Sequence, residues 1–210
     1  MSIESREENR VSTPQRRTKI TPEEYLEIER QAETKSEYYA GEMFALSGAS
    51  RYHNRIVRNL IATLHNRLRG GPCEVFPSDM RVKVEASGLY TYPDVSVVCG
   101  EAEFEDEHFD TLVNPTVVIE VLSRSTADYD RGRKAEHYRR LDSIREILLV
   151  WQDEIKVERH RRVGGSDWLL SAFAGADAVV ELASVACALP LSEVYERVWT
   201  VHGGTEPRTS

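Results

Sequence analysis

The strongest constraint in this sequence is a run of apolar residues that a single carboxylate interrupts. Residues 116–122, TVVIEVL, are apolar and β-branched nearly throughout, which is typical of a strand buried on both faces of a sheet. Glu120 lies inside this run. An isolated ionised carboxylate among apolar side chains is costly unless it is protonated, paired or bound to a cation. The run therefore predicts a buried strand with a carboxylate that needs a partner.

The elements around this strand predict an α/β (α+β) fold, a mixed central β-sheet flanked by helices. Thr21 and Glu24 form a capping-box pattern that begins a helix ending near Ala32. We expect further helices at 50–69 and 128–141 and from Ser192, and strands on both sides of the Ala40-Gly41 turn. The runs CEVF, RVKVEA and YPDVSVVC suggest an antiparallel meander, ILLVW (147–151) a second buried strand, and KVERHRR, WLLSAFA and AVVEL shorter alternating strands.

The composition of the chain and the positions of its unpatterned polar segments predict one soluble domain. The chain has 210 residues, of which 40% are hydrophobic and 30% charged, as in ordinary globular proteins. We expect a flexible leader at 1–19, a single domain at 20–200 and a flexible tail at 201–210. The start of the chain does not resemble a secretory signal, and its longest uncharged stretch is too short for a membrane span, so we expect a cytoplasmic protein with no membrane partner.

The three cysteines, Cys73, Cys99 and Cys187, are few and scattered. No pair has the short spacing of a zinc site, and the number is too small for a disulfide framework. They are therefore predicted to be buried thiols in a reducing compartment.

Two carboxylates on neighbouring predicted strands indicate a metal site. Asp94 begins the apolar run after Pro93, and Glu120 interrupts the next one. Oxygen ligands of this kind suit Mg²⁺ or Mn²⁺. Two ordinary interpretations remain open: Glu120 at a strand end could pair with an arginine, and Asp94 could merely follow proline in a turn.

A lysine on the predicted helix 128–141 is a third candidate. Lys134 shares a helical stripe with Tyr138 and Leu141, and that stripe should meet the sheet. An ammonium beside two metal-bound carboxylates could orient an attacking water and stabilise charge on a phosphoryl oxygen. Alternatively, the side chain only extends its amine to solvent.

Several segments together resemble a known family, from about residue 20 to 185. The chain resembles the Uma family of restriction endonucleases, within the PD-(D/E)XK nuclease superfamily. The segments that carry the resemblance are TPEEYLE, SEYYAGEMFALSG, YPDVSVV, NPTVVIEVLSRST, YDRGRKAEHYRR and ILLVW.

The resemblance implies a restriction-endonuclease-like fold and a metal-dependent phosphodiesterase site. Asp94 and Glu120 would match the two acidic elements and bind Mg²⁺ or Mn²⁺. Leu122 stands where the family pattern has lysine, and Lys134 would substitute for it. Glu37 would match a further acidic residue that binds metal directly or through water, although it could instead be an exposed strand residue.

Two further residues are second-tier candidates. His53 heads the apolar stripe of the helix at 50–69, where a lone histidine is more often packed and hydrogen-bonded than a ligand. Asp79 could cap a strand or a turn.

The leading hypothesis is a Mg²⁺- or Mn²⁺-dependent endonuclease that hydrolyses DNA. We expect a homodimer, because cutting both strands of a duplex requires two sites. A second hypothesis is a nuclease-like domain that binds nucleic acid or a protein without cutting. A third is a structural role in which the carboxylates pair with Arg124 or Arg139. Phosphate-loop, Gly-x-Ser-x-Gly and His-Glu-x-x-His signatures are absent from the sequence.

The net charge of −8, from 35 acidic and 27 basic residues, at first argues against DNA binding. However, six of the acidic residues lie between Glu101 and Asp110, and the rest of the chain sums to only −2. Arg51, Arg55 and Arg58 lie on the outer face of the predicted helix and could contact phosphates. We therefore expect weak, salt-sensitive DNA binding on one face, with the acidic loop turned away or acting as a gate.

Overall fold

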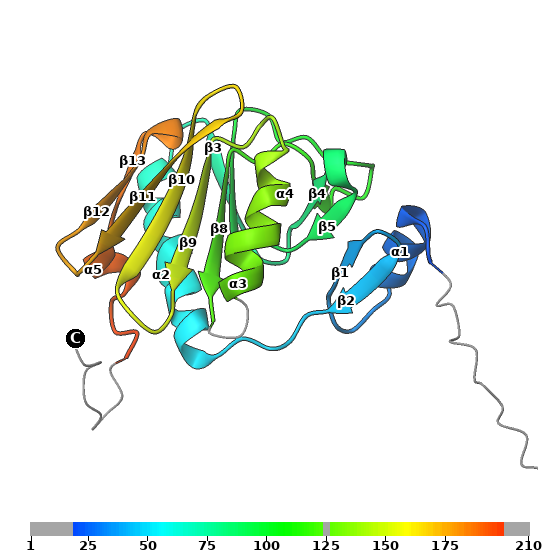
Figure 1. The fold of residues 1–210 in the computed structure, drawn as a ribbon, viewed down its shortest axis with the longest axis horizontal. Coiled ribbons are helices and arrows are strands. Elements are labelled where there is room, and N and C mark those ends of the chain that lie inside the picture. The colour runs from blue at the N-terminus through cyan, green and yellow to red at the C-terminus, as the bar shows by residue number, and fades with distance from the viewer. Residues whose placement is uncertain (1–18, 124–126, 200–210) are drawn as a thin grey trace, which may run out of the picture.

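The centre of the fold is a six-stranded sheet built around the predicted buried strand. The structure, a computed structural model, describes residues 19–123 and 127–199. The strands lie in the order β11-β10-β9-β8-β6-β3 (Figure 1), with β8 parallel to β9 and the other neighbours antiparallel. The predicted mixed central sheet is thereby confirmed. The bounds are β3 Cys73–Pro77, β6 Val95–Cys99, β8 Val117–Leu122, β9 Glu146–Trp151, β10 Lys156–Gly164 and β11 Asp167–Ala174.

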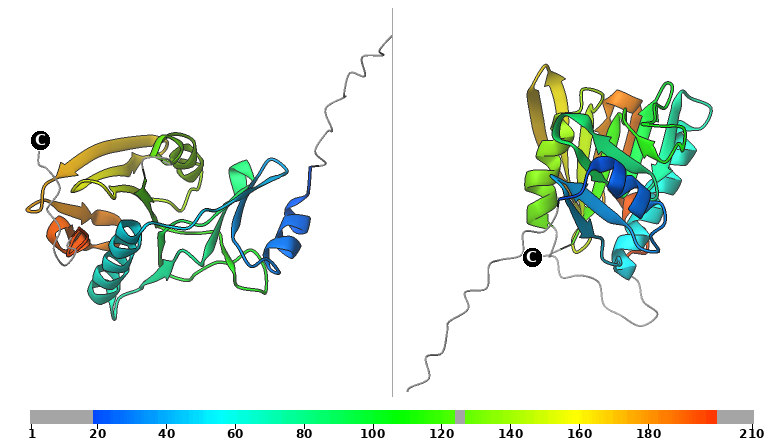
Figure 2. Two further views of the ribbon diagram at one scale, coloured as in Figure 1. Left: turned by 90° about the horizontal axis from the view of Figure 1, so that it is seen from below. Right: turned by 90° about the vertical axis from the view of Figure 1, so that its right-hand side faces the viewer.

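Helices cover both faces of this sheet, which explains why neither face of β8 is exposed to solvent. Every residue of β8 is buried. Val117, Ile119 and Val121 belong to the core shared with α2 (Arg51–Leu68), and Val118 and Leu122 belong to the core on the opposite face. That second face is covered by α3 (Ala127–Tyr129), the π-helical turn η2 (Asp130–Lys134) and α4 (Ala135–Arg139) (Figure 2). Each buried Val, Leu or Ile contributes roughly 1.5–3 kcal/mol.

A second, smaller sheet lies beside the central one and carries the N-terminal helix. Its strand order is β2-β1-β5-β4-β7, and its core is formed by Tyr25, Leu26, Tyr38 and Tyr90. The bounds are α1 Pro22–Glu29, β1 Ser36–Tyr39, β2 Glu42–Ala45, β4 Arg81–Val84, η1 Glu85–Ser87, β5 Leu89–Thr91 and β7 Thr111–Leu112. The remaining elements are β12 Val179–Leu182, η3 Ala183–Val185, β13 Cys187–Pro190 and α5 Leu191–Val194.

Helix beginnings were predicted better than helix interiors and ends. The Thr21–Glu24 capping box is present, and the Ser50 side chain accepts a hydrogen bond from the His53 amide to begin α2. The first helix ends at Glu29, before the predicted end, and the last begins at Leu191 and ends at Val194. The predicted helix 128–141 contains a π-helical turn, which side-chain periodicity does not reveal. Within the described residues no helix is long and apolar enough to cross a membrane.

The predicted antiparallel meander is wrong. β3 pairs directly with β6, whereas β4 lies between β5 and β7 in the other sheet. Alternation along a strand identifies its two faces but not its neighbours, because pairing partners are chosen by long-range packing. The excursion through β4 and β5 is what brings the second sheet beside the first.

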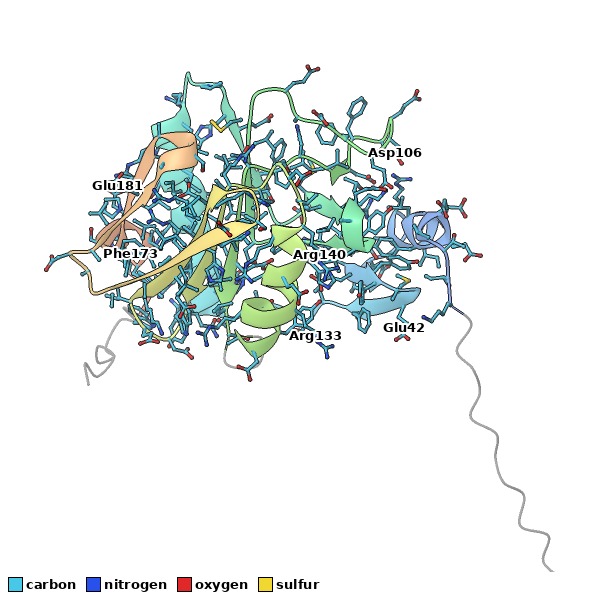
Figure 3. The ribbon with its side chains drawn as sticks, turned by 45° about the horizontal axis from the view of Figure 1, so that its top comes forward. Glu42, Asp106, Arg133, Arg140, Phe173 and Glu181 are labelled. Atoms are coloured by element: carbon cyan, nitrogen blue, oxygen red, sulfur yellow. A yellow bond between two sulfur atoms is a disulfide. The ribbon has the colours of Figure 1, made fainter. Side chains whose placement is uncertain are left out.

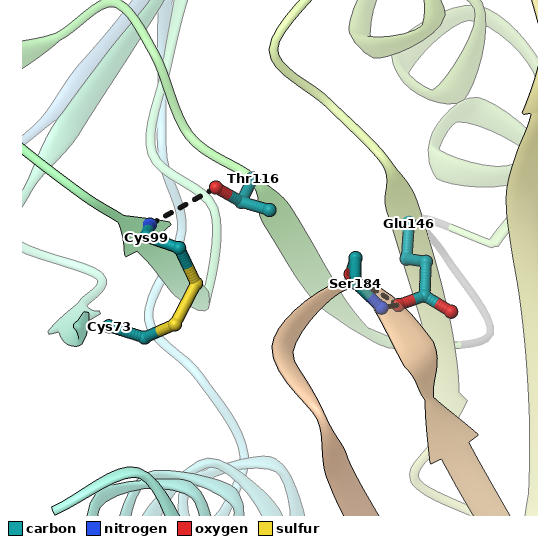
Figure 4. The surroundings of a disulfide bond; sticks show 5 residues. All are labelled: Cys73, Cys99, Thr116, Glu146 and Ser184. Carbon is teal, nitrogen blue, oxygen red and sulfur yellow. Dashed lines mark hydrogen bonds between the residues drawn. A yellow bond between two sulfur atoms is a disulfide. The ribbon is translucent and has the colours of Figure 1, made fainter. Parts of the chain in front are cut away.

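The prediction that all three cysteines are thiols is also wrong. Cys73 and Cys99 form a disulfide between β3 and β6, across a sequence separation of 26, while Cys187 is free and buried (Figure 4). The two residues are directly opposite in the antiparallel register. Thr116 accepts a hydrogen bond from the Cys99 amide at 3.1 Å. Cys73 and Cys99 are close in space because β3 pairs with β6, although they are far apart in the sequence.

The acidic segment 101–110 is tied to the N-terminal helix by ion pairs. Arg30 donates to Asp110 at 2.8 Å and to Asp106 at 2.7 Å, and Arg81 lies 3.0 Å from Asp110. Burial alone would raise the pKa of Asp110, but the hydrogen bond from Arg30 and the charge of Arg81 hold it well below its usual range. Part of the negative charge of this segment is thus paired with arginines within the fold.

Reduction of the disulfide should lower stability. For a loop of this length the entropy of the unfolded chain predicts a loss of about 3 kcal/mol. Urea unfolding of the wild type with and without dithiothreitol measures it, and Cys73→Ser should reproduce the loss without reductant. A Cys187→Ser variant should keep the dithiothreitol response. If the reductant has no effect on the wild type, the cysteines are thiols in solution.

The Arg30–Asp110 pair should make stability fall at acid pH. Because the folded-state pKa is lowered, the contribution of Asp110 is present above the unfolded value of about 3.9 and is lost as pH falls below it. The difference in urea midpoint between wild type and Asp110→Asn should therefore shrink from pH 7 to pH 3. Glu107→Gln removes an exposed charge from the same loop and should change little at either pH. A difference for Asp110→Asn that is independent of pH would contradict this account.

Candidate active site

A buried ion cluster joins the central sheet to the helix that covers it. Glu120 on β8 and Lys134 at the end of η2 are 4% and 5% exposed, and the Lys134 ammonium lies 2.9 Å from Oε1 of Glu120. The Tyr138 hydroxyl donates to the same oxygen at 2.5 Å. Lys134 and Tyr138 are four residues apart and project from one side of the helix onto the sheet. The partner that the buried carboxylate requires is therefore an ammonium and a phenol.

The second sheet contributes another carboxylate to the same ammonium. Glu37 on β1 is 5% exposed, and its Oε1 lies 2.9 Å from Nζ of Lys134. Thr91 on β5 donates to this oxygen at 2.5 Å. Lys134 thus bridges two carboxylates that come from different sheets. Glu37 is not the exposed strand residue that the sequence left open.

Asp94 lies immediately before Val95, the first residue of β6, and beside Glu120. Because Val95 pairs with Ile119 in the antiparallel register, the next position along places Asp94 next to Glu120. Oδ2 of Asp94 accepts a hydrogen bond from the Val121 amide at 2.7 Å and lies 3.1 Å from Nε2 of His53. The side chains of Asp94 and His53 are about one-sixth exposed, at 15% and 17%. Asp94 therefore sits where the cluster meets solvent.

Electrostatics distinguish the members of this cluster. Burial raises the pKa of Glu120 to about 8, against the attraction of Lys134 and with a contribution from the charges of Asp130 and Asp94. Burial would lower the pKa of Lys134, but the carboxylates of Glu120 and Glu37 hold it well above its ordinary value. Lys134 therefore keeps its proton, and negative charge at Glu120 is stabilised by this ammonium and by the hydrogen bond from Tyr138.

The donor set suits a hard divalent cation. Described contacts to Asp94 all use Oδ2, and those to Glu120 all use Oε1, so within the described chain one oxygen of each carboxylate carries no hydrogen bond. Carboxylate oxygens are the ligands that Mg²⁺ and Mn²⁺ prefer. Residues 19–123 and 127–199 nevertheless contain no group of three or more His, Cys, Asp or Glu side chains arranged around one metal position. Among the described side chains, Asp94 and Glu120 would supply two carboxylate ligands, and a cation held there would need further ligands.

The ordinary alternatives for these residues do not hold in the structure. Glu120 does not point outward toward an arginine, and Lys134 does not extend to solvent, since both side chains are buried against each other. Arg139 contacts Nδ1 of His160 instead, and Arg124 lies outside the described residues. Asp94 is not a simple turn residue, because it accepts a backbone hydrogen bond from β8.

Other predicted residues lie outside the cluster. Asp79 has an exposed side chain that pairs with Lys35 at 2.6 Å. Arg55 donates to the Val198 carbonyl at 2.7 Å, and Arg58 donates to Asn59, so both guanidinium groups have partners within the protein. Arg51 is exposed at the beginning of α2.

Two members of the site carry roles that sequence reasoning missed. Tyr138 was expected only to share a stripe with Lys134, and its helical spacing is the signal that could have assigned it to Glu120. Thr91 gave no such signal, because its contact with Glu37 crosses from β5 to β1.

Comparisons with known proteins identify the family of this chain. The sequence matches the profile of the Uma2 family, described as "Putative restriction endonuclease", over residues 22–192. The uncharacterized protein sll1609 of Synechocystis sp. (strain ATCC 27184 / PCC 6803 / Kazusa) is 40% identical over 162 residues, 77% of this chain and 92% of that protein. A second uncharacterized protein of that strain, slr1290, is 34% identical over 177 residues, 84% of this chain and 92% of that protein.

A solved structure supports the fold. The crystal structure of "a putative nuclease belonging to DUF820" from Anabaena variabilis ATCC 29413 superposes with a TM-score of 0.70, covering 85% of this chain and 99% of that one at 21% identity. Such identity shows a shared fold alone. The family profile, spanning most of the chain, carries the assignment: this protein belongs to the Uma2 family, a restriction-endonuclease-like nuclease family.

Proposed function

We propose that this protein is a metal-dependent endonuclease that hydrolyses DNA phosphodiester bonds. The observation that carries the proposal is the meeting of Asp94, Glu120 and Lys134 at one end of β6 and β8, two carboxylates and an ammonium at the boundary between core and solvent. Family membership supports the nuclease class. The metal, the substrate and the residue roles are our inference from these side chains.

Asp94 and Glu120 would hold the cation, Mg²⁺ or Mn²⁺. Asp94 is positioned for this by two hydrogen-bond partners on one oxygen, which leave the other oxygen to a ligand. The chemistry such a cation supplies is a lowered pKa for a coordinated water and stabilisation of charge on the phosphoryl group. Glu37, held by Thr91, would act through Lys134 or through water.

Lys134 would assist the attacking water and stabilise phosphoryl charge. Its ammonium is fixed between Glu37 and Glu120, so little reorganisation is required when the substrate arrives. It reaches this place from the helix, whereas Leu122, the residue two beyond Glu120, is buried in the core. The helical lysine is thus a substitute for the strand lysine of the family pattern.

A nuclease-like domain that binds without cutting is the second candidate. It is favoured by the pairing of Lys134 with two carboxylates, which occupies the ammonium, and by the lack of a three-ligand group among the described residues. Cutting both strands of a duplex would in addition require two sites, and we keep the homodimer as a prediction.

Cleavage of supercoiled plasmid in Mg²⁺ or Mn²⁺ tests the proposal. Asp94→Asn and Glu120→Gln should each reduce the rate roughly 100-fold or more, because each removes a charged ligand from the reacting centre. Asp79→Asn is the matched control, since it neutralises a carboxylate outside the cluster and should leave the rate unchanged. Equal cutting by wild type and Asp94→Asn would mean that the activity is a contaminant.

Metal binding separates the enzyme from the inert domain. A cation that binds only the folded protein stabilises it, by about 2.7 kcal/mol at a concentration 100 times the dissociation constant. Mg²⁺ or Mn²⁺ should therefore raise the melting temperature of the wild type and of Asp79→Asn, but not that of Glu120→Gln. Isothermal titration calorimetry should likewise detect cation binding to the wild type and to Asp79→Asn, but not to Glu120→Gln. A wild-type protein that neither binds nor is stabilised by either cation fits the second candidate.

A further inference from the structure

Exposed aromatic side chains gather around the candidate active site. Five aromatic residues of the described chain are clearly exposed, and four of them lie on elements that supply the cluster and His53 or on the elements next to these: Tyr39, Phe44, Tyr52 and Tyr129, with exposures of 40%, 48%, 38% and 40%. The fifth, Phe109, lies in the acidic segment. Single apolar residues on a surface need no explanation, but a concentration at one polar site does.

Two of these residues belong to the β1–β2 hairpin that supplies Glu37. Phe44 is directly opposite Glu37 in the antiparallel register, so the two side chains lie on the same face. Tyr39 follows Glu37 by two residues on that face, and its ring lies 4.8 Å from the ring of His137. The hairpin thus presents two aromatic rings beside the Glu37–Lys134 pair.

The other two come from the helical elements. Tyr129 ends α3, just before η2, and burial together with the charge of Glu37 raises the pKa of its hydroxyl, which lies within electrostatic reach of the cluster. Tyr52 precedes His53, the residue bound to Asp94, in the first turn of α2. The connection at 46–50 runs from the hairpin to this turn along the same end of the central sheet (Figure 1).

Two exposed arginines lie close in sequence to these rings or to the cluster. Arg51 adjoins Tyr52, and Arg133 adjoins Lys134. Arg133 projects from η2 at the edge of the molecule where Glu42 of the hairpin also projects (Figure 3). Aromatic rings interleaved with cationic groups are what a single nucleic-acid strand requires, since bases stack on the rings and phosphates meet the cations.

We infer that Tyr39, Phe44, Tyr52 and Tyr129 form a stacking rim for unpaired bases, so that the preferred substrate is single-stranded or locally unpaired DNA. The inference rests on the proposed function for its substrate class. In duplex DNA the faces of the bases are covered by their neighbours, and exposed rings then have little to stack on. The rim therefore favours the binding of single-stranded DNA over duplex DNA.

Binding in EDTA tests the rim without any cutting. Fluorescence anisotropy of the full chain would use a labelled single strand of roughly 16 nucleotides, its blunt duplex, and the same strand with abasic positions. The single strand should bind about tenfold more tightly than the duplex, and the abasic strand should lose this advantage. The Phe44→Leu/Tyr129→Leu double variant should weaken single-strand binding about 5- to 100-fold.

Conservative variants distinguish stacking from loss of structure. Phe44→Tyr and Tyr129→Phe keep a ring and should keep the affinity, whereas Phe109→Leu removes an exposed ring outside the rim and should have no effect. Unchanged melting temperatures would establish that the leucine variants are folded. The inference is overturned if the leucine variants bind like the wild type, or if single strand and duplex bind equally.

The outcome is independent of whether the protein cuts. If the wild type cuts neither plasmid nor single-stranded DNA in Mg²⁺ or Mn²⁺ but keeps the single-strand preference in binding, the enzyme is refuted and the rim stands. Cleavage together with equal binding of both DNA forms would do the reverse. A second copy of the chain is the competing occupant of these rings. If Phe44→Asp converts a dimer to a monomer in sedimentation and the wild type shows no single-strand preference, the rim is a dimer interface instead.

Discussion

The contact of Lys134 with Glu120 and Glu37 is the interaction on which the rest of the site depends. An ammonium and two carboxylates, each at least nine-tenths buried, would be costly singly and are tolerable only together. The three residues come from η2, β8 and β1, so the cluster holds a helix and two sheets in one arrangement. Removing Lys134 would leave two buried carboxylates without their cation, whereas removing either carboxylate would leave a single ion pair. In the proposed nuclease, the same contacts would hold negative and positive groups beside the phosphodiester.

The second sheet is therefore part of the site rather than an appendage. Its strands β1 and β5 provide Glu37 and Thr91, and its outer hairpin provides Tyr39 and Phe44. The acidic segment 101–110 is bound to Arg30 and Arg81 at the other side of that sheet. These pairs offset the negative charge of the segment locally, while the net charge of the chain stays −8.

Patterns with a short range were predictable from sequence. The capping box at Thr21, the apolar stripe of α2 and the buried runs of β8 and β9 follow from residue spacing, because helix and strand geometry repeat every few residues. Pairing across long separations was not. The predicted meander was wrong because β3 pairs with β6. The prediction of three free thiols was wrong because that pairing places Cys73 opposite Cys99.

The sequence by itself determined that Glu120 must be buried and must have a partner, since a carboxylate inside TVVIEVL has no solvent to stabilise it. It also determined that Lys134 and Tyr138 share one face of a helix. Only the tertiary structure decided that this face lies over Glu120, that Glu37 arrives from another sheet, and that Tyr39 and Phe44 remain exposed on the hairpin that carries Glu37. The physical reason is that burial and helical spacing are local properties of the chain, whereas contacts between elements depend on how distant apolar faces pack together.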